Sequence, residues 1–173
     1  GPRWRVEIDG ALAGVLGLLP APTIGGLLTV TLEPPGFVPI SLESALIPVS
    51  RAEPSAGHVD FLHLHAGLSL CPLAVEGERL ALHACAGADA GAVLVIGGTL
   101  SVPERERLIG QAHLVVRGYW RVAEPLVLRI GLHLLVPFRH DAFRYLDGMG
   151  ALQAFYSPDP IAGLLDLGLG LRF

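Results

Sequence analysis

The last ten residues of the chain alternate strictly between large apolar residues and small or polar ones. One face of an extended strand would carry Leu165, Leu167, Leu169, Leu171 and Phe173, and the other would carry Asp166, Gly168, Gly170 and Arg172. This period of two predicts a β-strand over 164–173. Two glycines and one Asp/Arg pair would make a poor water-facing surface. We therefore interpret the leucine face as facing lipid and the other face as lining a narrow lumen.

The same alternation recurs in seven earlier segments. They cover residues 3–18, 22–33, 38–49, 59–71, 79–96, 111–122 and 126–138. Each is long enough for the roughly 9 to 11 tilted residues with which a strand crosses a bilayer. With the terminal strand they make eight, an even number as in bacterial barrels. The predicted fold is all-β: an eight-stranded antiparallel up-and-down transmembrane barrel with periplasmic termini.

The lengths of the connections agree with this topology. The turns after the second, fourth and sixth strands are short, at 34–37, about 75–78 and 123–125, whereas the links after the third, fifth and seventh strands include 51–57, 97–110 and 139–160. Short turns are expected in the periplasm and long loops outside the cell. We expect Trp4, Trp120 and Phe173 at the periplasmic end, as an aromatic belt at the membrane interface. Pro39 and Pro48 are expected at the two ends of the third strand.

Composition narrows the class of protein further. The 173 residues are 51% hydrophobic, yet no run approaches the roughly 18 apolar residues of a spanning helix. The 22 glycines and 14 prolines disfavour a helical bundle. Residues 1–173 are predicted to form one domain, either alone or as the C-terminal domain of a longer protein. A soluble β-sandwich or ligand-binding barrel with its leucines inside is the alternative.

Charge argues against nucleic acid as a partner. The net charge is −4, and the 12 basic residues are all arginine and are dispersed along the chain. Five of these arginines fall on the predicted lumen face, where they belong to the largest polar set of the sequence. This set comprises Arg5, Glu7, Asp9, Glu43, His63, His65, Asp89, Arg117, Arg121, Arg129, His133, Asp166 and Arg172. We interpret it as an ion-paired plug, because eight strands leave no aqueous channel. A proton or ion path is the alternative.

Cys71 and Cys85 are predicted to form a disulfide. Both fall on the lumen face of the hairpin made by the fourth and fifth strands, and a turn centred near Glu78 places them opposite each other. The periplasm is oxidising, which favours the bond. Metal binding with His63, His65 and His83 is the competing interpretation. The spacing lacks a CxxC or HxxxH pattern, so we expect neither a metal nor a cofactor.

A catalytic set can be drawn from the same face. Ser69 lies between His65 and Cys71, and Asp89 is available across the sheet, as a nucleophile, a base and an orienting acid require. However, these residues point inward, away from lipid substrates. We expect a protein that is not an enzyme, and keep an outer-membrane lipid-modifying enzyme as the alternative.

Several segments resemble a known family. They are a Cys at the end of the fourth strand, a Cys preceded by "LHA" and followed by "AGA", the segment "LVLRIGLHLLVPFRHDAF", and the ending "PIAGLLDLGLGLRF". They are similar to the small outer-membrane-barrel domains found in many paralogous proteins of myxobacteria and related proteobacteria. The resemblance implies a bacterial outer-membrane location and the barrel fold, and it implies no activity or binding residue.

The expected function is that of a membrane anchor or an interaction and adhesion module. Its expected partners are the lipid bilayer and the barrel-assembly machinery, since a strand ending in Phe173 resembles the terminal signal of outer-membrane barrels. A protein partner would contact the loop 139–160 through Phe143, Tyr145, Phe155 and Tyr156. The alternative is that these aromatic side chains pack on one another or on the barrel rim.

Overall fold

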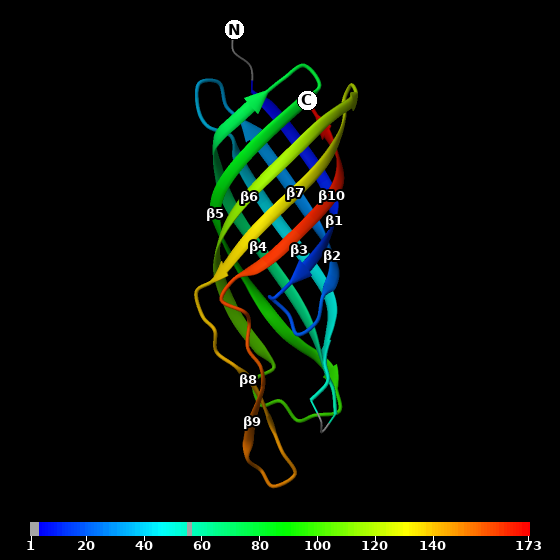
Figure 1. Cartoon of the computed structure of the whole chain (residues 1–173), viewed down its shortest axis with the longest axis vertical. Coiled ribbons are helices and arrows are strands. Elements are labelled where there is room, and N and C mark those ends of the chain that lie inside the picture. Colours follow the sequence, from blue (N-terminus) through cyan, green and yellow to red (C-terminus); the bar gives the residue numbers. More distant parts are fainter. Residues whose placement is uncertain (1–3, 55–56) are drawn as a thin grey trace.

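The chain forms a closed antiparallel barrel with a small hairpin at one end (Figure 1). The computed structural model describes residues 4–54 and 57–173; Arg3, where the first predicted strand begins, lies outside this range. The barrel strands are β1 (Arg5–Leu16), β2 (Thr23–Glu33), β3 (Ile40–Ala52), β4 (Val59–Glu76), β5 (Leu80–Gly98), β6 (Glu106–Ala123), β7 (Leu126–Pro137) and β10 (Ala162–Arg172). The hairpin consists of β8 (Phe143–Leu146) and β9 (Leu152–Tyr156). The predicted eight-stranded barrel is confirmed.

The strands follow one another around the barrel in chain order. The last strand, β10, closes the sheet by pairing with both β7 and β1. Along the β1–β10 seam, Glu7 lies opposite Arg172 and Leu16 lies opposite Gly163. Figure 1 shows both ends of the chain at one end of the barrel, with β8 and β9 at the other. Because the sheet closes on itself, each barrel strand has a hydrogen-bonded neighbour on both sides.

Side chains alternate between an apolar outside and a largely polar inside. Leu12, Leu132 and Leu165 are 71%, 63% and 57% exposed, whereas Arg117 and Arg129 are 0% exposed. Water would penalise such an apolar outer surface, but hydrocarbon would not. This distribution contradicts the soluble alternative, in which the leucines line the interior. None of the described residues forms a helix long and apolar enough to cross a bilayer.

Three details differ from the prediction. Strands β4 and β5 continue to Glu76 and Gly98, and β6 begins at Glu106, so these strands extend beyond the predicted segments. Pro48 lies inside β3, at a register shift between Ile47 and Ser50, where a missing amide donor is tolerated. The link 139–160 contains the hairpin β8–β9, which pairs Phe143 with Tyr156 and Leu146 with Leu152.

Two inward-facing glycines make room for buried carboxylates. Gly67 lies opposite Asp89 and Gly131 lies opposite Asp166 in the sheet register. A Cβ atom at either glycine would overlap the facing carboxylate. The small inward residues therefore hold space in which the polar side chains of neighbouring strands can turn toward one another.

Candidate functional site

The polar residues inside the barrel form two groups. The lumen cluster lies in the middle of the barrel and comprises Asp9, Thr29, Glu43, Asp89, Gln111, His113, Arg117, Arg129, His133 and Asp166. The mouth cluster lies at the end that holds the termini and comprises Arg5, Glu7, Glu33, Glu76, His83, Arg121 and Arg172.

Arg129 is the centre of the lumen cluster. Its Nε and Nη2 atoms donate to Asp166 Oδ1 at 2.9 and 2.7 Å, and Nη1 donates to Thr29 Oγ1 at 2.7 Å. Nη1 also donates to Asp9. The guanidinium is fully buried and joins carboxylates from β1 and β10, the two strands that close the barrel. Arg129 therefore holds together the two strands, β1 and β10, at which the barrel closes.

A second arginine extends the lumen cluster across the barrel. Arg117 on β6 donates to Glu43 on β3. His133 connects the Arg117–Glu43 pair to the Arg129–Asp166 pair. Its Nε2 lies 2.7 Å from Asp166, and its Nδ1 lies 3.6 Å from Glu43. Strands that are not neighbours in the sheet are thereby linked through the interior.

Asp89 gathers a third set of contacts. It accepts a hydrogen bond from Gln111 Nε2 at 3.1 Å, and His113 Nδ1 lies 2.9 Å from its Oδ1. His63 and His65 point inward from β4, with ring centroids 4.9 Å apart. Both are buried, and neither His63 nitrogen has a hydrogen-bond partner among the described residues. These two histidines line the lumen without joining its ion pairs.

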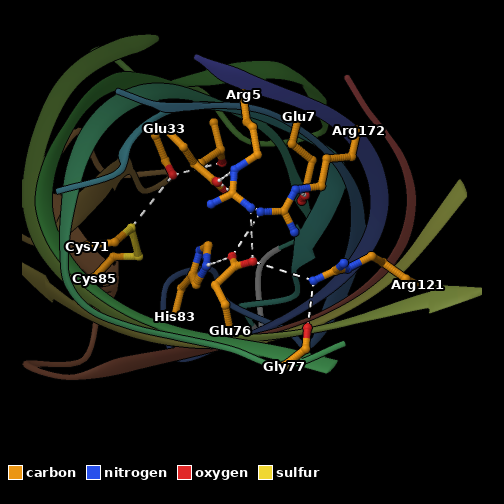
Figure 2. A network of polar contacts seen from close by, with 12 residues as sticks. Arg5, Glu7, Glu33, Cys71, Glu76, Gly77, His83, Cys85, Arg121 and Arg172 are labelled. Carbon is orange, nitrogen blue, oxygen red and sulfur yellow. Dashed lines mark hydrogen bonds and ion pairs between the residues drawn. A yellow bond between two sulfur atoms is a disulfide. The ribbon is translucent and has the colours of Figure 1, made fainter. Parts of the chain in front are cut away.

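The mouth cluster closes the end of the lumen next to the termini (Figure 2). Arg172 Nη2 donates to both carboxylate oxygens of Glu33, at 2.9 and 2.8 Å, and to Glu76 at 2.9 Å. Arg5 pairs with Glu33 at 2.8 Å and with Glu76 at 3.2 Å. Arg121 is 36% exposed and donates to the Gly77 carbonyl at 2.7 Å. Arg5 and Arg121 therefore lie at the rim, while the other predicted arginines lie inside.

The predicted set omitted several members of these clusters. Glu33, Gln111 and His113 lie on the inward faces of their strands. Their place in the period-two pattern is sufficient to predict that they face the lumen. Glu33 also lies directly opposite Arg5 in the β1–β2 register. Glu76 lies beyond the predicted end of the fourth strand, so its inward contact depends on the longer β4.

The disulfide between Cys71 and Cys85 is present. It joins β4 to β5 on the side of the mouth cluster that faces the middle of the barrel. It falls where the β4–β5 register shifts between Leu70 and Leu73. Ser41 Oγ on β3 lies 3.8 Å from Cys71 Sγ and 3.0 Å from Thr31 Oγ1 on β2. The bond fixes β4 and β5 to each other at an irregular point of the sheet.

One group of side chains among residues 4–54 and 57–173 has a metal-like arrangement. Ligand atoms of Glu33, Glu76 and His83 lie within 4.8 Å of one another. Both carboxylates already accept hydrogen bonds from Arg172, and Arg5 pairs with each of them. Two guanidinium groups beside the ligand atoms oppose a dication electrostatically. The donor set therefore fits an ion-pair network better than a metal.

The catalytic set drawn from the sequence is not assembled. Ser69 Oγ is buried and has no hydrogen-bond partner among the described residues. A serine nucleophile needs a base within hydrogen-bond reach. Neither His65 nor Asp89 takes that place, and Asp89 is instead engaged by Gln111 and His113.

The aromatic residues of the link 139–160 cover the other end of the barrel. Phe143 and Tyr145 are buried, and Phe155 and Tyr156 are partly buried. The Phe143 and Phe155 rings lie 5.1 and 6.0 Å from the ring of Phe61, which points into the lumen from β4. For Phe143 and Tyr145 the burial agrees with the alternative, in which the loop aromatics pack on one another and on the barrel rim. Phe143 packs on Phe61, and Tyr145 packs on Phe155 with ring centroids 5.9 Å apart, so these aromatic side chains form a lid over the barrel end.

The tip of the hairpin is held by a carboxylate. Asp147 accepts hydrogen bonds from the backbone amides of Ala151 at 2.8 Å and Met149 at 2.9 Å. These bonds, that of Ala151 first, lower the pKa of Asp147 below its ordinary value. Met149 itself is 91% exposed. The tip is thus an ordered turn that presents an apolar side chain.

The predicted belt residues lie at the end of the barrel that holds the termini. Trp4, Trp120 and Phe173 are 62%, 50% and 68% exposed. Trp120 lies opposite Leu80 and Leu128 in the sheet, and the backbones of Phe173 and Val6 exchange hydrogen bonds. An aromatic belt at the membrane interface would occupy this position.

Comparison with solved structures finds proteins with the same fold. A major outer membrane protein from Thermus thermophilus matches with a TM-score of 0.67 and 16% identity, over 99% of this chain and 100% of that one. Neisserial surface protein A matches with a TM-score of 0.58 and 15% identity, over 100% and 99%. No protein-family model and no curated protein sequence matches the chain.

A third similar structure comes from Yersinia pestis. It is Ail, the attachment invasion locus protein, in complex with the heparin analogue sucrose octasulfate, with a TM-score of 0.53 and 16% identity over 98% of this chain and 97% of that one. The chain therefore has the fold of the eight-stranded outer-membrane β-barrels. An outer-membrane location, expected from the sequence, agrees with this fold and with the apolar outer surface.

Proposed function

We propose that this protein is a non-enzymatic outer-membrane anchor whose barrel is plugged by its own side chains. Its outer end, which is the end that carries hairpin β8–β9, serves as an interaction or adhesion module. The observation that carries the proposal is the pair of fully buried arginines, Arg117 and Arg129, each ion-paired across the lumen. An eight-stranded barrel has an interior that side chains can fill.

The ion pairs argue against a conducting lumen. Removing one partner of a buried pair costs roughly 3 to 5 kcal/mol, because the other charge stays buried without compensation. Opening a path along the lumen would separate Arg129 from Asp9 and Asp166, which come from different strands. The mouth cluster adds a second barrier at the end with the termini.

Planar-bilayer recording tests the plug. The purified full chain, inserted into a bilayer, is expected to give no discrete conductance steps at moderate voltage. A large-pore porin inserted in the same bilayer serves as the positive control. Reproducible steps of one amplitude from the full chain would overturn the plug and favour the ion path.

The outer end is the part available for a partner. Hairpin β8–β9 extends beyond the barrel strands (Figure 1), and its exposed apolar residues are Leu146, Met149 and Leu152. Exposed loops on a rigid scaffold are frequent recognition sites. Ail, which has the same fold, is described in complex with a heparin analogue. This likeness supports a binding role for the protein.

An adhesion assay tests the outer end. Bacteria that display the full chain are compared with bacteria that display a variant in which residues 146–152 are replaced by Gly and Ser. We expect the variant to fold, because the lid aromatics are kept, and to lose cell-to-cell or surface adhesion. Equal adhesion by the two strains would exclude the tip as the interaction module.

We also propose that the assembly machinery of the outer membrane recognises strand β10. Phe173 follows the last residue of this strand and has an exposed ring. Phe173→Ala is expected to lower the amount of folded protein in the membrane several-fold, while the purified variant still folds in detergent. An unchanged membrane yield would contradict the role of this residue.

A further inference from the structure

A cleft lies at the outer end of the barrel, between the start of β6, the end of β7 and the hairpin β8–β9. Its volume is about 410 Å³. Its lining includes the charged residues Glu104, Arg107, Arg139, Asp141 and Arg144 and the leucines Leu108 and Leu152. Three of these are arginines that come from three different segments of the chain, and they differ in how the protein itself uses them.

Arg107 is occupied by contacts within the protein. Its guanidinium pairs with Glu104, donates to the Asp141 carbonyl at 2.5 Å and lies 4.0 Å from the centre of the Phe143 ring. These contacts fix the floor of the cleft against the aromatic lid. The pKa of Glu104 is lowered by its hydrogen bond to Arg107, which keeps this carboxylate ionised and the charge of the arginine balanced.

Arg139 and Arg144 differ from Arg107. Both are exposed, and neither makes an ion pair or a side-chain hydrogen bond within residues 4–54 and 57–173. Each guanidinium therefore keeps five donors for a ligand. Arginine donors match the oxygens of a phosphate group in a fork-like geometry. The remaining charge of the cleft is low, since Asp141 partly offsets the two cations. This favours a single anionic group over an extended polyanion.

The walls of the cleft are apolar on the side that faces the barrel surface. Leu108 is 75% exposed, and it lies on the outward face of β6 in line with Leu114 and Val116. Leu152 on β9 is 54% exposed. Leu108 also borders a depression that is lined in part by Ser44, Ala66 and Ala90, exposed residues with little side-chain bulk. The cleft thus joins unpaired cations to the apolar band that faces hydrocarbon.

We propose that this cleft binds the phosphate group of an outer-leaflet lipid, with Arg139 and Arg144 on the phosphate and the acyl chains against Leu108 and the depression beside it. The proposal rests on the membrane location but not on the plugged lumen. A soluble anion would use the two arginines and gain nothing from the apolar wall. A lipid would use both, because its phosphate and its acyl chains are joined, as the two arginines and Leu108 adjoin in one cleft.

Native mass spectrometry of the full chain in detergent tests this proposal. The probes are phosphatidic acid, phosphatidylcholine, inorganic phosphate and a sulfated heparin fragment. We expect the wild type to retain phosphatidic acid at least fivefold more than phosphatidylcholine. The variant with Arg139→Gln and Arg144→Gln is expected to lose this preference. Arg105→Gln, which removes an exposed arginine at the same end but outside the cleft, is the matched control and should behave as the wild type.

Several results would overturn the proposal. The first is that the wild type retains phosphatidic acid and phosphatidylcholine equally. The second is that Arg105→Gln loses the preference for phosphatidic acid as fully as the double variant does. The third is that inorganic phosphate or the heparin fragment displaces the lipid at the concentration at which the lipid binds. If the double variant does not fold, Arg144→Lys keeps the charge and is expected to retain more than half of the preference; its complete loss would count against a phosphate contact. Conductance in the bilayer assay would remove the plug and leave this site in place.

Discussion

At the scale of single residues, Arg129 is the side chain on which the interior depends most. It touches Asp9, Thr29 and Asp166, and it has no exposed surface. Arg129→Met would leave two carboxylates without their cation. We expect the free energy of unfolding to fall by roughly 3 to 5 kcal/mol, measured by urea titration of the barrel folded in lipid.

Arg121→Met is the control for this substitution. Arg121 is also inward on its strand, but it lies at the rim and is 36% exposed, so solvent screens its pair with Glu76. The expected loss is within about 1 kcal/mol. Equal effects of the two substitutions would contradict the distinction between lumen and mouth clusters.

The disulfide gives a second prediction at this scale. Cys71 and Cys85 close a loop with a sequence separation of 14. The double variant Cys71→Ala, Cys85→Ala is expected to lose up to about 3 kcal/mol, because the unfolded chain gains conformational freedom. Wild type unfolded with a reductant should match the double variant. Free thiols in the unfolded wild type without reductant would show that the bond is not formed.

The sequence predicted which residues face inward but not which of them pair. The period-two pattern fixes the face of a residue, because successive side chains of a strand point to opposite sides. Arg129 and Asp9 are 120 residues apart and on strands that are not adjacent in the sheet. Their contact depends on how the strands are staggered around the barrel and on the space left at glycines such as Gly131. The stagger of the strands cannot be predicted from the alternation pattern of a single sequence.

At the scale of elements, hairpin β8–β9 was the main feature missed. Its turn contains Asp147-Gly148, a dipeptide typical of tight hairpins, between two short segments rich in aromatic residues. This signal was sufficient to predict a hairpin in the link 139–160. The burial of its aromatics was not predictable in the same way. It depends on Phe61, which belongs to the much earlier strand β4.

Asp147 makes the hairpin tip sensitive to acid. Its pKa lies below the ordinary value of 3.8, so its contribution to the order of the turn is complete above that value and is lost as the pH falls through the lowered pKa. We expect the amides of Met149 and Ala151 to lose protection from hydrogen exchange below that pH. The barrel amides should remain protected.

Asp147→Asn separates charge from hydrogen bonding at this turn. The amide oxygen can still accept from Met149 and Ala151, but it does not titrate in this range. The variant is therefore expected to keep its tip protection at low pH. A loss of protection in this variant at the same pH as in the wild type would assign the acid response to another group.

At the scale of the whole molecule, the barrel is apolar outside, ion-paired inside and covered by an aromatic lid at its outer end. The apolar exterior could be predicted because eight segments share one alternation. The lid and the arginine-lined cleft could not, because both are assembled from the ends of several strands. Their chemistry comes from contacts such as Arg107 with Phe143, which join segments far apart in sequence.

The most direct test of the central claim measures which solvent touches the outward leucines. A spin label at Leu165, which is 57% exposed on β10, is compared with one at Met149 on the hairpin tip, in the full chain reconstituted in lipid vesicles. We predict that collisions with oxygen, which concentrates in hydrocarbon, dominate at Leu165, and that collisions with a water-soluble nickel chelate dominate at Met149. Strong access of the nickel chelate to Leu165 would contradict a lipid-facing exterior.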